Sequence, residues 1–162
     1  DDSKEGGVGC CLYLKKIMGM WLTNRLRDEL CPGEDWDRLV VRAKLDPFDG
    51  LVDAEDHDFL APESMAKAFD SKLTGKPDDP AGYFRCAWRS LADTYGRAIR
   101  TMEQSTGIVC HKLYIVGGGA KNSFLNKLTE KSTGKQIIAL PIEATAVGNI
   151  KVQMISEKEI AE

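Results

Sequence analysis

Two long stretches of the chain place apolar residues at helical spacing. Over 14–30 they recur every three or four positions, which predicts an amphipathic helix that ends at Cys31-Pro32-Gly33. Gly19 falls inside this range, where glycine costs about 1 kcal/mol relative to alanine, so we expect a close neighbour there. The second stretch predicts a long core helix over 81–105, with inward positions at Phe84, Trp88, Leu91, Tyr95, Ile99 and Met102.

The remaining pattern predicts shorter elements in the order of an α/β domain. Short apolar runs predict buried strands over 112–116 and 136–140. Helices are expected over 36–43, 122–132 and 143–155, with a further helix starting at 62–65. Glycine, proline and acidic residues make 5–9 and 44–62 candidates for irregular segments. Because a helix separates the two expected strands, they should run parallel, and no other strand is expected.

Length and composition limit the possible classes of function. The 162 residues suit one domain, and 43% hydrophobic with 29% charged residues is typical of a folded globular chain. A net charge of −3 argues against nucleic acid and against an anionic membrane as partners. No apolar run approaches the roughly 20 residues that span a bilayer, and the start lacks the features of a signal peptide. We therefore expect a cytoplasmic location.

Thiols, imidazoles and metal ligands give little support for a site. The five cysteines are odd in number and lack C-x-x-C spacing, so neither a disulfide framework nor a zinc site is expected. Histidine occurs only at His57 and His111. The acidic residues of 49–58 lack the order of ligands, central glycine and closing glutamate of a calcium loop. A solvated acidic surface is the favoured interpretation, and no metal site is assigned.

The strongest indication of function is the stretch LYIVGGGAKN, Leu113 to Asn122. A predicted strand runs directly into Gly117, Gly118 and Gly119 and then into a predicted helix. Backbone bends in this way where something comes very close to it. The pyrophosphate of a dinucleotide, the phosphates of ATP, and tight packing of a strand on a helix are three explanations.

Spacing separates these explanations in part. The dinucleotide fingerprint needs a third glycine where this chain has Asn122, and no acidic residue ends the second strand to bind a ribose. The P-loop pattern fails because its four-residue gap and Lys-Ser/Thr pair are absent. Free N–H groups at a helix start still favour an anion, and the Asn122 amide suits a purine edge or a ribose. Packing alone stays open.

Four stretches together resemble a known family. Ile115 to Leu125 is similar to the adenosine-binding motif of the FGGY carbohydrate kinases, which share a superfamily with actin, hexokinase and heat-shock chaperones. Residues 14–22, 59–65 and 143–150 resemble the rhamnulokinase branch of that family. These stretches occur in the family's order and span nearly the whole chain, which is much more specific than one glycine turn.

The resemblance implies a fold and an activity. The fold is expected to be α/β and ribonuclease H-like, as in actin-like ATPases and hexokinase, rich in helices with few strands. Residues 1–162 would form a partial C-terminal, nucleotide-side domain, with the sugar-binding and catalytic domain upstream. The complete enzyme would transfer the γ-phosphoryl group of ATP, with Mg²⁺, to the 1-hydroxyl of L-rhamnulose. Fuculokinase, xylulokinase and a nucleotide-binding scaffold or chaperone are the alternatives.

The resemblance also implies site residues, position by position. Gly117, Gly118 and Gly119 would meet the α-phosphate and the adenosine, and Asn122 would border the nucleotide. Two polar family positions that face the nucleotide correspond to Lys16 and Asn24, where asparagine and glutamine are usual. Asn24 keeps hydrogen-bonding capacity with a shorter reach, whereas Lys16 either helps a phosphate or is simply solvated. No aspartate here matches the catalytic base, so the 162 residues alone are expected to be inactive.

Overall fold

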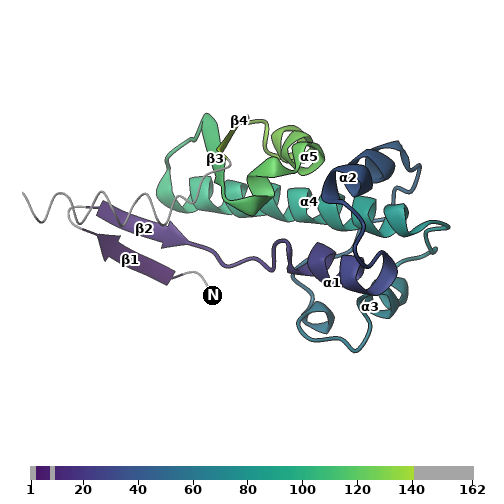
Figure 1. Ribbon diagram of the computed structural model, residues 1–162. Coiled ribbons are helices and arrows are strands. Elements are labelled where there is room, and N and C mark those ends of the chain that lie inside the picture. The colour runs from purple at the N-terminus through teal and green to yellow at the C-terminus, as the bar shows by residue number, and fades with distance from the viewer. Residues whose placement is uncertain (1–2, 8–9, 141–162) are drawn as a thin grey trace, which may run out of the picture.

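The computed structural model describes residues 3–7 and 10–140, with side chains from residue 14 onward (Figure 1). The predicted helix over 143–155 lies outside this part. The elements in chain order are β1 (Ser3–Gly7), β2 (Cys10–Leu14), α1 (Trp21–Leu30), α2 (Trp36–Leu45), η1 (His57–Phe59), α3 (Met65–Lys72), α4 (Pro80–Thr106), β3 (Lys112–Val116), η2 (Gly118–Lys121), α5 (Ser123–Thr133) and β4 (Gln136–Leu140).

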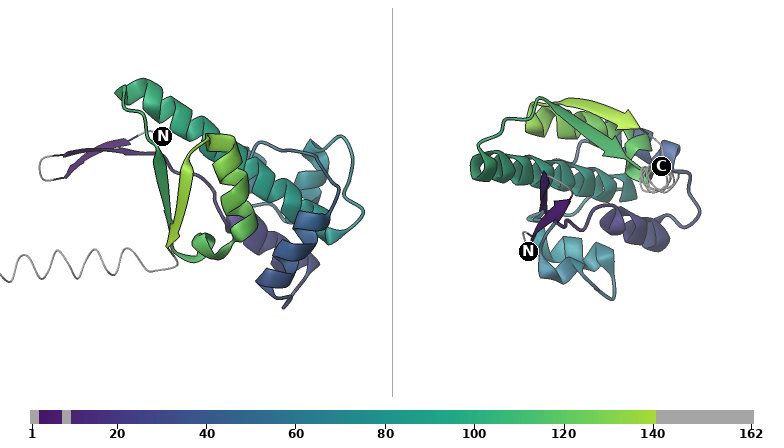
Figure 2. Two further views of the ribbon diagram at one scale, coloured as in Figure 1. Left: turned by 90° about the horizontal axis from the view of Figure 1, so that it is seen from above. Right: turned by 90° about the vertical axis from the view of Figure 1, so that its left-hand side faces the viewer.

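Helix α4 is the central element of the fold and confirms the predicted long helix. Asp79 caps its start by accepting a hydrogen bond from the N–H of Ala81, with Pro80 at the first helical position, and Gly107 ends it at φ 71°. In Figures 1 and 2, α2 and α5 lie on one side of α4, and α1 and α3 lie on the other. Neither α4 nor any other helix among the placed residues is long and apolar enough to cross a membrane.

One hydrophobic core joins these helices. Its largest members on α4 are Trp88 and Phe84, both fully buried, and Phe84 also meets Trp36 of α2. The other helices each contribute buried apolar side chains from one face, as their helical spacing predicts: Leu22, Leu26, Leu39, Ala43, Met65, Phe69 and Leu125. Helices α2 and α3 therefore confirm the predictions at 36–43 and 62–65.

The two predicted strands pair in parallel, as expected. β3 and β4 align from Lys112 opposite Gln136 to Val116 opposite Leu140, and α5 connects them. They are not buried strands, however. Tyr114 is 59% exposed and Val116 is 46% exposed, whereas the alternate residues of β3 are half-buried. The reason is that only one face of the pair packs on other elements among the placed residues.

The start of the chain differs from the prediction in two respects. Residues 5–9 were expected to be a loop, but β1 and β2 form an antiparallel hairpin in which Gly7 lies opposite Cys10. Backbone pairing does not depend on side chains, so glycine at a hairpin end is compatible with a strand. The predicted helix over 14–30 is also too long, because Leu14 ends β2 and α1 begins only at Trp21.

Gly19 explains where α1 begins. Its φ of 60° is left-handed, which interrupts a helix and which glycine adopts without strain. The close neighbour expected at Gly19 is absent among the placed residues, since the nearest atom to an added Cβ is the Ile17 carbonyl oxygen at 3.7 Å. Ile17 and Met18 nevertheless pack on the core, so the apolar spacing that suggested a helix belongs partly to an irregular segment.

Candidate functional site

The glycine turn follows β3 directly and reverses the chain into α5. Gly117 has φ 82° and ψ −161°, a backbone conformation that residues other than glycine rarely adopt. Two hydrogen bonds then close the turn: the N–H of Ala120 donates to the Gly117 carbonyl and the N–H of Asn122 to the Gly119 carbonyl, each at 3.1 Å. The N–H groups of Gly118 and Gly119 precede these donors, so they have no acceptor within the turn.

Tight packing against residues 14–140 does not explain Gly118 and Gly119. An added Cβ on Gly118 meets no placed heavy atom within 4 Å, and on Gly119 it meets only the Met20 side chain, at 3.9 Å. The Cβ position of Gly118 therefore opens onto space that no described residue fills, and a side chain there would occupy room that a ligand could use. This geometry favours a bound molecule over packing as the reason for the second and third glycines.

Asn122 holds the turn on the start of α5. It is 7% exposed, and its Oδ1 accepts a hydrogen bond from the N–H of Leu125 at 2.9 Å. One turn further along, Nδ2 of Asn126 donates to the Ala120 carbonyl at 2.8 Å. The carbonyl end of the Asn122 side chain is thus engaged as a helix cap, a role that the sequence reasoning did not assign to it.

A pocket of about 630 Å³ lies between the glycine turn and the first turns of α1 and α2. Four predicted residues from two distant parts of the sequence line it together: Asn24, and Gly118, Gly119 and Asn122 of the glycine turn. Gly117 does not line the pocket but sets the direction of the turn. Lys16 lies in the segment before α1, is exposed, and does not line this pocket.

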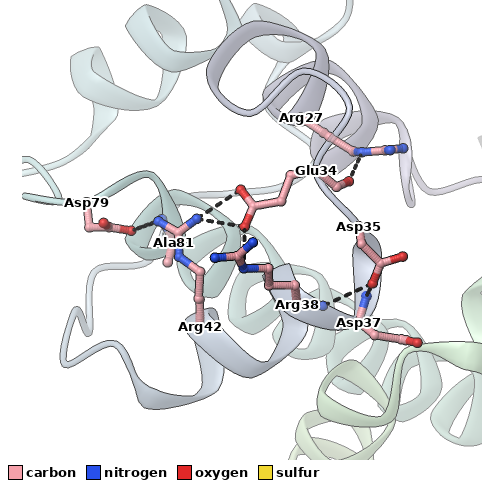
Figure 3. Close-up of polar contacts among 8 residues, drawn as sticks. All are labelled: Arg27, Glu34, Asp35, Asp37, Arg38, Arg42, Asp79 and Ala81. Carbon is pink, nitrogen blue, oxygen red and sulfur yellow. Dashed lines mark hydrogen bonds and ion pairs between the residues drawn. The ribbon is translucent and has the colours of Figure 1, made fainter.

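The wall of the pocket that α2 provides was not predicted from the sequence. Asp35, Trp36, Asp37 and Val40 line it, together with Met20 and Lys121. Asp35 is the N-cap of α2 and accepts from the N–H groups of Asp37 at 2.9 Å and Arg38 at 3.3 Å (Figure 3). An aspartate before an apolar periodic run indicates a helix start. It does not indicate that this start faces a glycine turn about 80 residues later.

A network of charged groups fixes this wall to the rest of the fold (Figure 3). Nε of Arg27, near the end of α1, donates to the Glu34 carbonyl at 2.8 Å. The Glu34 carboxylate accepts from Arg42 at 2.9 Å, and Arg42 also reaches Asp79, the cap of α4, at 2.7 Å. Arg42 lowers the pKa of Glu34, and Glu34 raises the pKa of Arg42. The segment before α2 is therefore held by α1 at Glu34, and Arg42 in the last turn of α2 ties Glu34 to the cap of α4.

The acidic segment before α3 is paired with basic side chains. Lys72 contacts Asp56 at 2.8 Å and Asp58 at 2.6 Å, which raises its pKa to about 12. Arg97 contacts Asp53 at 2.9 Å. Within residues 14–140, no group of three His, Cys, Asp or Glu side chains is arranged to hold a metal ion. The pairing accounts for these carboxylates as surface ion pairs.

Comparisons with known proteins identify relatives over almost the whole chain. Rhamnulokinase of Bacillus subtilis (strain 168) is 36% identical over 163 residues, covering 98% of this chain and 34% of its own length. Rhamnulokinase of Lactiplantibacillus plantarum is 34% identical over 161 residues, covering 96% and 33%. That of Bacteroides thetaiotaomicron is 33% identical over 164 residues, covering 97% and 33%. The chain thus spans only 33–34% of the length of these relatives.

The family model for the FGGY family of carbohydrate kinases, C-terminal domain, matches residues 5–157. This range includes most of the hairpin, the pocket and the glycine turn. The resemblance found in the four sequence stretches is therefore confirmed at the level of the family. With these matches, the chain belongs to the FGGY family of carbohydrate kinases and is close to rhamnulokinase.

Proposed function

We propose that this chain is the nucleotide-side part of an ATP-dependent sugar kinase that phosphorylates L-rhamnulose at its 1-hydroxyl. The observation that carries this proposal is the pocket in which Asn24, Gly118, Gly119 and Asn122 meet. Family membership supports a carbohydrate kinase, and the relatives named rhamnulokinase support the sugar. The proposal includes a ribonuclease H-like fold for the domain and a separate upstream domain that contributes the sugar site and the catalytic base.

The residues of the pocket fit ATP. The N–H groups of Gly118 and Gly119, which have no acceptor within the turn, suit phosphate oxygens, and Lys121 adds a positive charge beside them. On the opposite wall, Met20, Trp36 and Val40 provide apolar surface for a base. In the proposal the turn binds the α-phosphate region, Asn24 hydrogen-bonds the nucleoside, and Asn122 keeps the turn in place. A role for Lys16 stays a prediction.

The placed residues do not fit the Mg²⁺ that the proposed reaction uses. Magnesium prefers carboxylate and water oxygens in an octahedral arrangement, and no suitable cluster exists among residues 14–140. Asp35 already caps α2 through Oδ1. We therefore assign no metal ligand to this chain and derive no catalytic step through the ion. Phosphate positioning is the contribution that its residues can make.

Sugar-stimulated ATP turnover by the full-length protein tests the proposal. We expect ADP release to depend on L-rhamnulose and to be much slower with L-fuculose or D-xylulose, measured by a coupled ADP assay at saturating MgATP. Faster turnover with L-fuculose or D-xylulose would contradict L-rhamnulose as the substrate but would still support a sugar kinase. Turnover that no sugar stimulates would favour the scaffold or chaperone alternative. A cytoplasmic location, where ATP is available, is part of the same proposal.

A further inference from the structure

Trp36 stands out among the residues that line the pocket. It is the first residue of α2, it is half-buried, and it is the only aromatic side chain lining the pocket among the placed residues. Val40, one helical turn further on, and Met20, just before α1, extend the same apolar surface. Indole has the largest aromatic face of any side chain, so it offers a purine base both dispersion and stacking.

The Trp36 ring is held before any ligand arrives. The Arg27 guanidinium lies 4.8 Å from the ring centroid, and the Phe84 ring stands nearly perpendicular to it, at 84° and 6.4 Å between centroids. Arg27 is itself fixed by its hydrogen bond to the Glu34 carbonyl. An aromatic ring that is already fixed loses little side-chain entropy when a base stacks on it.

Charge in the pocket indicates which end of a nucleotide meets this wall. Asp35 and Asp37 flank Trp36 along the chain, and both line the pocket. Carboxylates repel phosphate, and Asp35 already occupies the N–H groups at the start of α2 that would otherwise attract an anion. Lys121 and the N–H groups that have no acceptor within the turn lie on the glycine turn instead. The phosphates therefore belong at the turn and the base belongs at α2.

We propose that Trp36 is the base-binding residue of this pocket, with the purine ring of ATP or ADP lying against the indole while the phosphates reach Gly118 and Lys121. This inference rests on the proposed nucleotide-binding function and adds the residue that recognises the base. Stacking accepts any purine face, so affinity should depend on an aromatic base more than on its hydrogen-bonding edge.

The test measures binding to the full-length protein by calorimetry, with ADP and with inorganic tripolyphosphate, which has phosphates but no base. We expect Trp36→Ala and Trp36→Leu to weaken ADP roughly 5- to 150-fold, the range that loss of one base–aromatic stack produces. Tripolyphosphate affinity should stay the same in both variants. Trp36→Phe should restore most of the ADP affinity, since phenyl keeps an aromatic face.

Trp21→Phe is the matched control, because Trp21 is 43% exposed, donates to the Phe59 carbonyl and does not line the pocket. It should bind ADP as the wild type does. Equal loss of ADP and tripolyphosphate in Trp36→Leu, or unchanged ADP affinity, would overturn the role of Trp36. Gly118→Val tests the nucleotide site separately from the role of Trp36. If both Trp36→Leu and Gly118→Val leave ADP binding unchanged, the assignment of this pocket to a nucleotide is wrong.

Discussion

Gly118 lines the pocket, and its missing side chain leaves space that no placed atom fills. We expect Gly118→Val to raise the KM for ATP of the full-length protein at least several-fold, because the added methyl groups enter the pocket beside the free N–H groups. The KM for the sugar should change little. Steady-state kinetics with each substrate varied in turn will measure both.

Gly75→Val is a matched control for that prediction. An added Cβ at Gly75 also meets no placed atom within 4 Å, but this residue does not line the pocket at the glycine turn. The KM for ATP of the Gly75→Val variant should equal that of the wild type. If the KM for ATP of Gly118→Val also equals that of the wild type, the glycine turn does not bind the nucleotide.

Asn122 is expected to matter for stability as well as for the site. Asn122→Ala removes the acceptor that caps α5, which typically costs about 0.5–2 kcal/mol. For a domain of this size, the melting temperature should fall by roughly 2–4 °C per kcal/mol. Asn122→Ser keeps a capping oxygen and should recover most of the loss in a thermal unfolding experiment. An equal melting temperature for the alanine and serine variants would argue against the cap.

At the scale of elements, spacing predicted the helices best where one face is continuously apolar. Helices α2, α4 and α5 and strands β3 and β4 begin and end within two residues of their predicted bounds. The start of α1 was wrong because the apolar spacing of Ile17 and Met18 continues through a segment that Gly19 prevents from being helical. The hairpin was missed because its glycines resemble those of a loop.

The crossing of α4 and α5 depends on Gly96. A Cβ added there would meet the Ser132 hydroxyl and lie 3.0 Å from the Ser132 carbonyl oxygen, so the helices could not stay as close. We expect Gly96→Val to lower the free energy of unfolding by about 1–3 kcal/mol, the usual cost of overpacking. Urea denaturation measures it, with Gly75→Val as the control. A fully stable Gly96→Val would show that the crossing can relax.

The pair Glu103–Lys135 joins the end of α4 to the start of β4 and makes stability depend on pH. The carboxylate accepts from Lys135 at 2.6 Å and from the N–H of Cys110 at 2.8 Å, and these contacts lower the pKa of Glu103. A lowered folded pKa stabilises the fold above the unfolded pKa, about 4.3, and this stabilisation is lost as pH falls through the folded pKa.

The unfolding free energy, measured in urea, should therefore fall between about pH 5 and about pH 3. Glu103→Gln should reduce the size of this fall, because the amide does not titrate. Glu130→Gln removes an exposed carboxylate of α5 and serves as the control, which should keep the wild-type fall. An identical pH dependence in Glu103→Gln and the wild type would mean that the Glu103–Lys135 pair contributes nothing to the pH dependence of the unfolding free energy.

At the scale of the whole molecule, the glycine turn could be read from the sequence but its surroundings could not. Asn24, Gly118, Gly119 and Asn122 were assigned through the family resemblance, and they meet at one pocket. The wall formed by Trp36 and Asp37 depends on how α2 packs beside α5, a tertiary contact that no local spacing encodes. The exposure of Tyr114 likewise depends on what covers the sheet, not on the apolar run itself.

The 162 residues by themselves are expected to bind ADP with a Kd above about 1 mM. This Kd corresponds to a binding free energy of roughly −4 kcal/mol. A few backbone hydrogen bonds supply about 0.5–1.5 kcal/mol each, and association itself costs several kcal/mol. Calorimetry on the isolated chain, with circular dichroism to verify folding, will measure this. Micromolar affinity would contradict the expectation and show that these residues form a complete site.

The geometry of the glycine turn has a consequence for the gene. Glycine alone lacks a Cβ, so every missense change in a glycine codon adds at least that atom. At Gly117 that atom meets a backbone conformation that only glycine adopts easily, and at Gly118 it enters the pocket. At Gly117 even alanine is therefore strained, whereas at Gly118 the cost grows with the size of the side chain that enters the pocket. In a library of random variants we expect missense changes at both positions to be depleted, while changes at Gly75 survive.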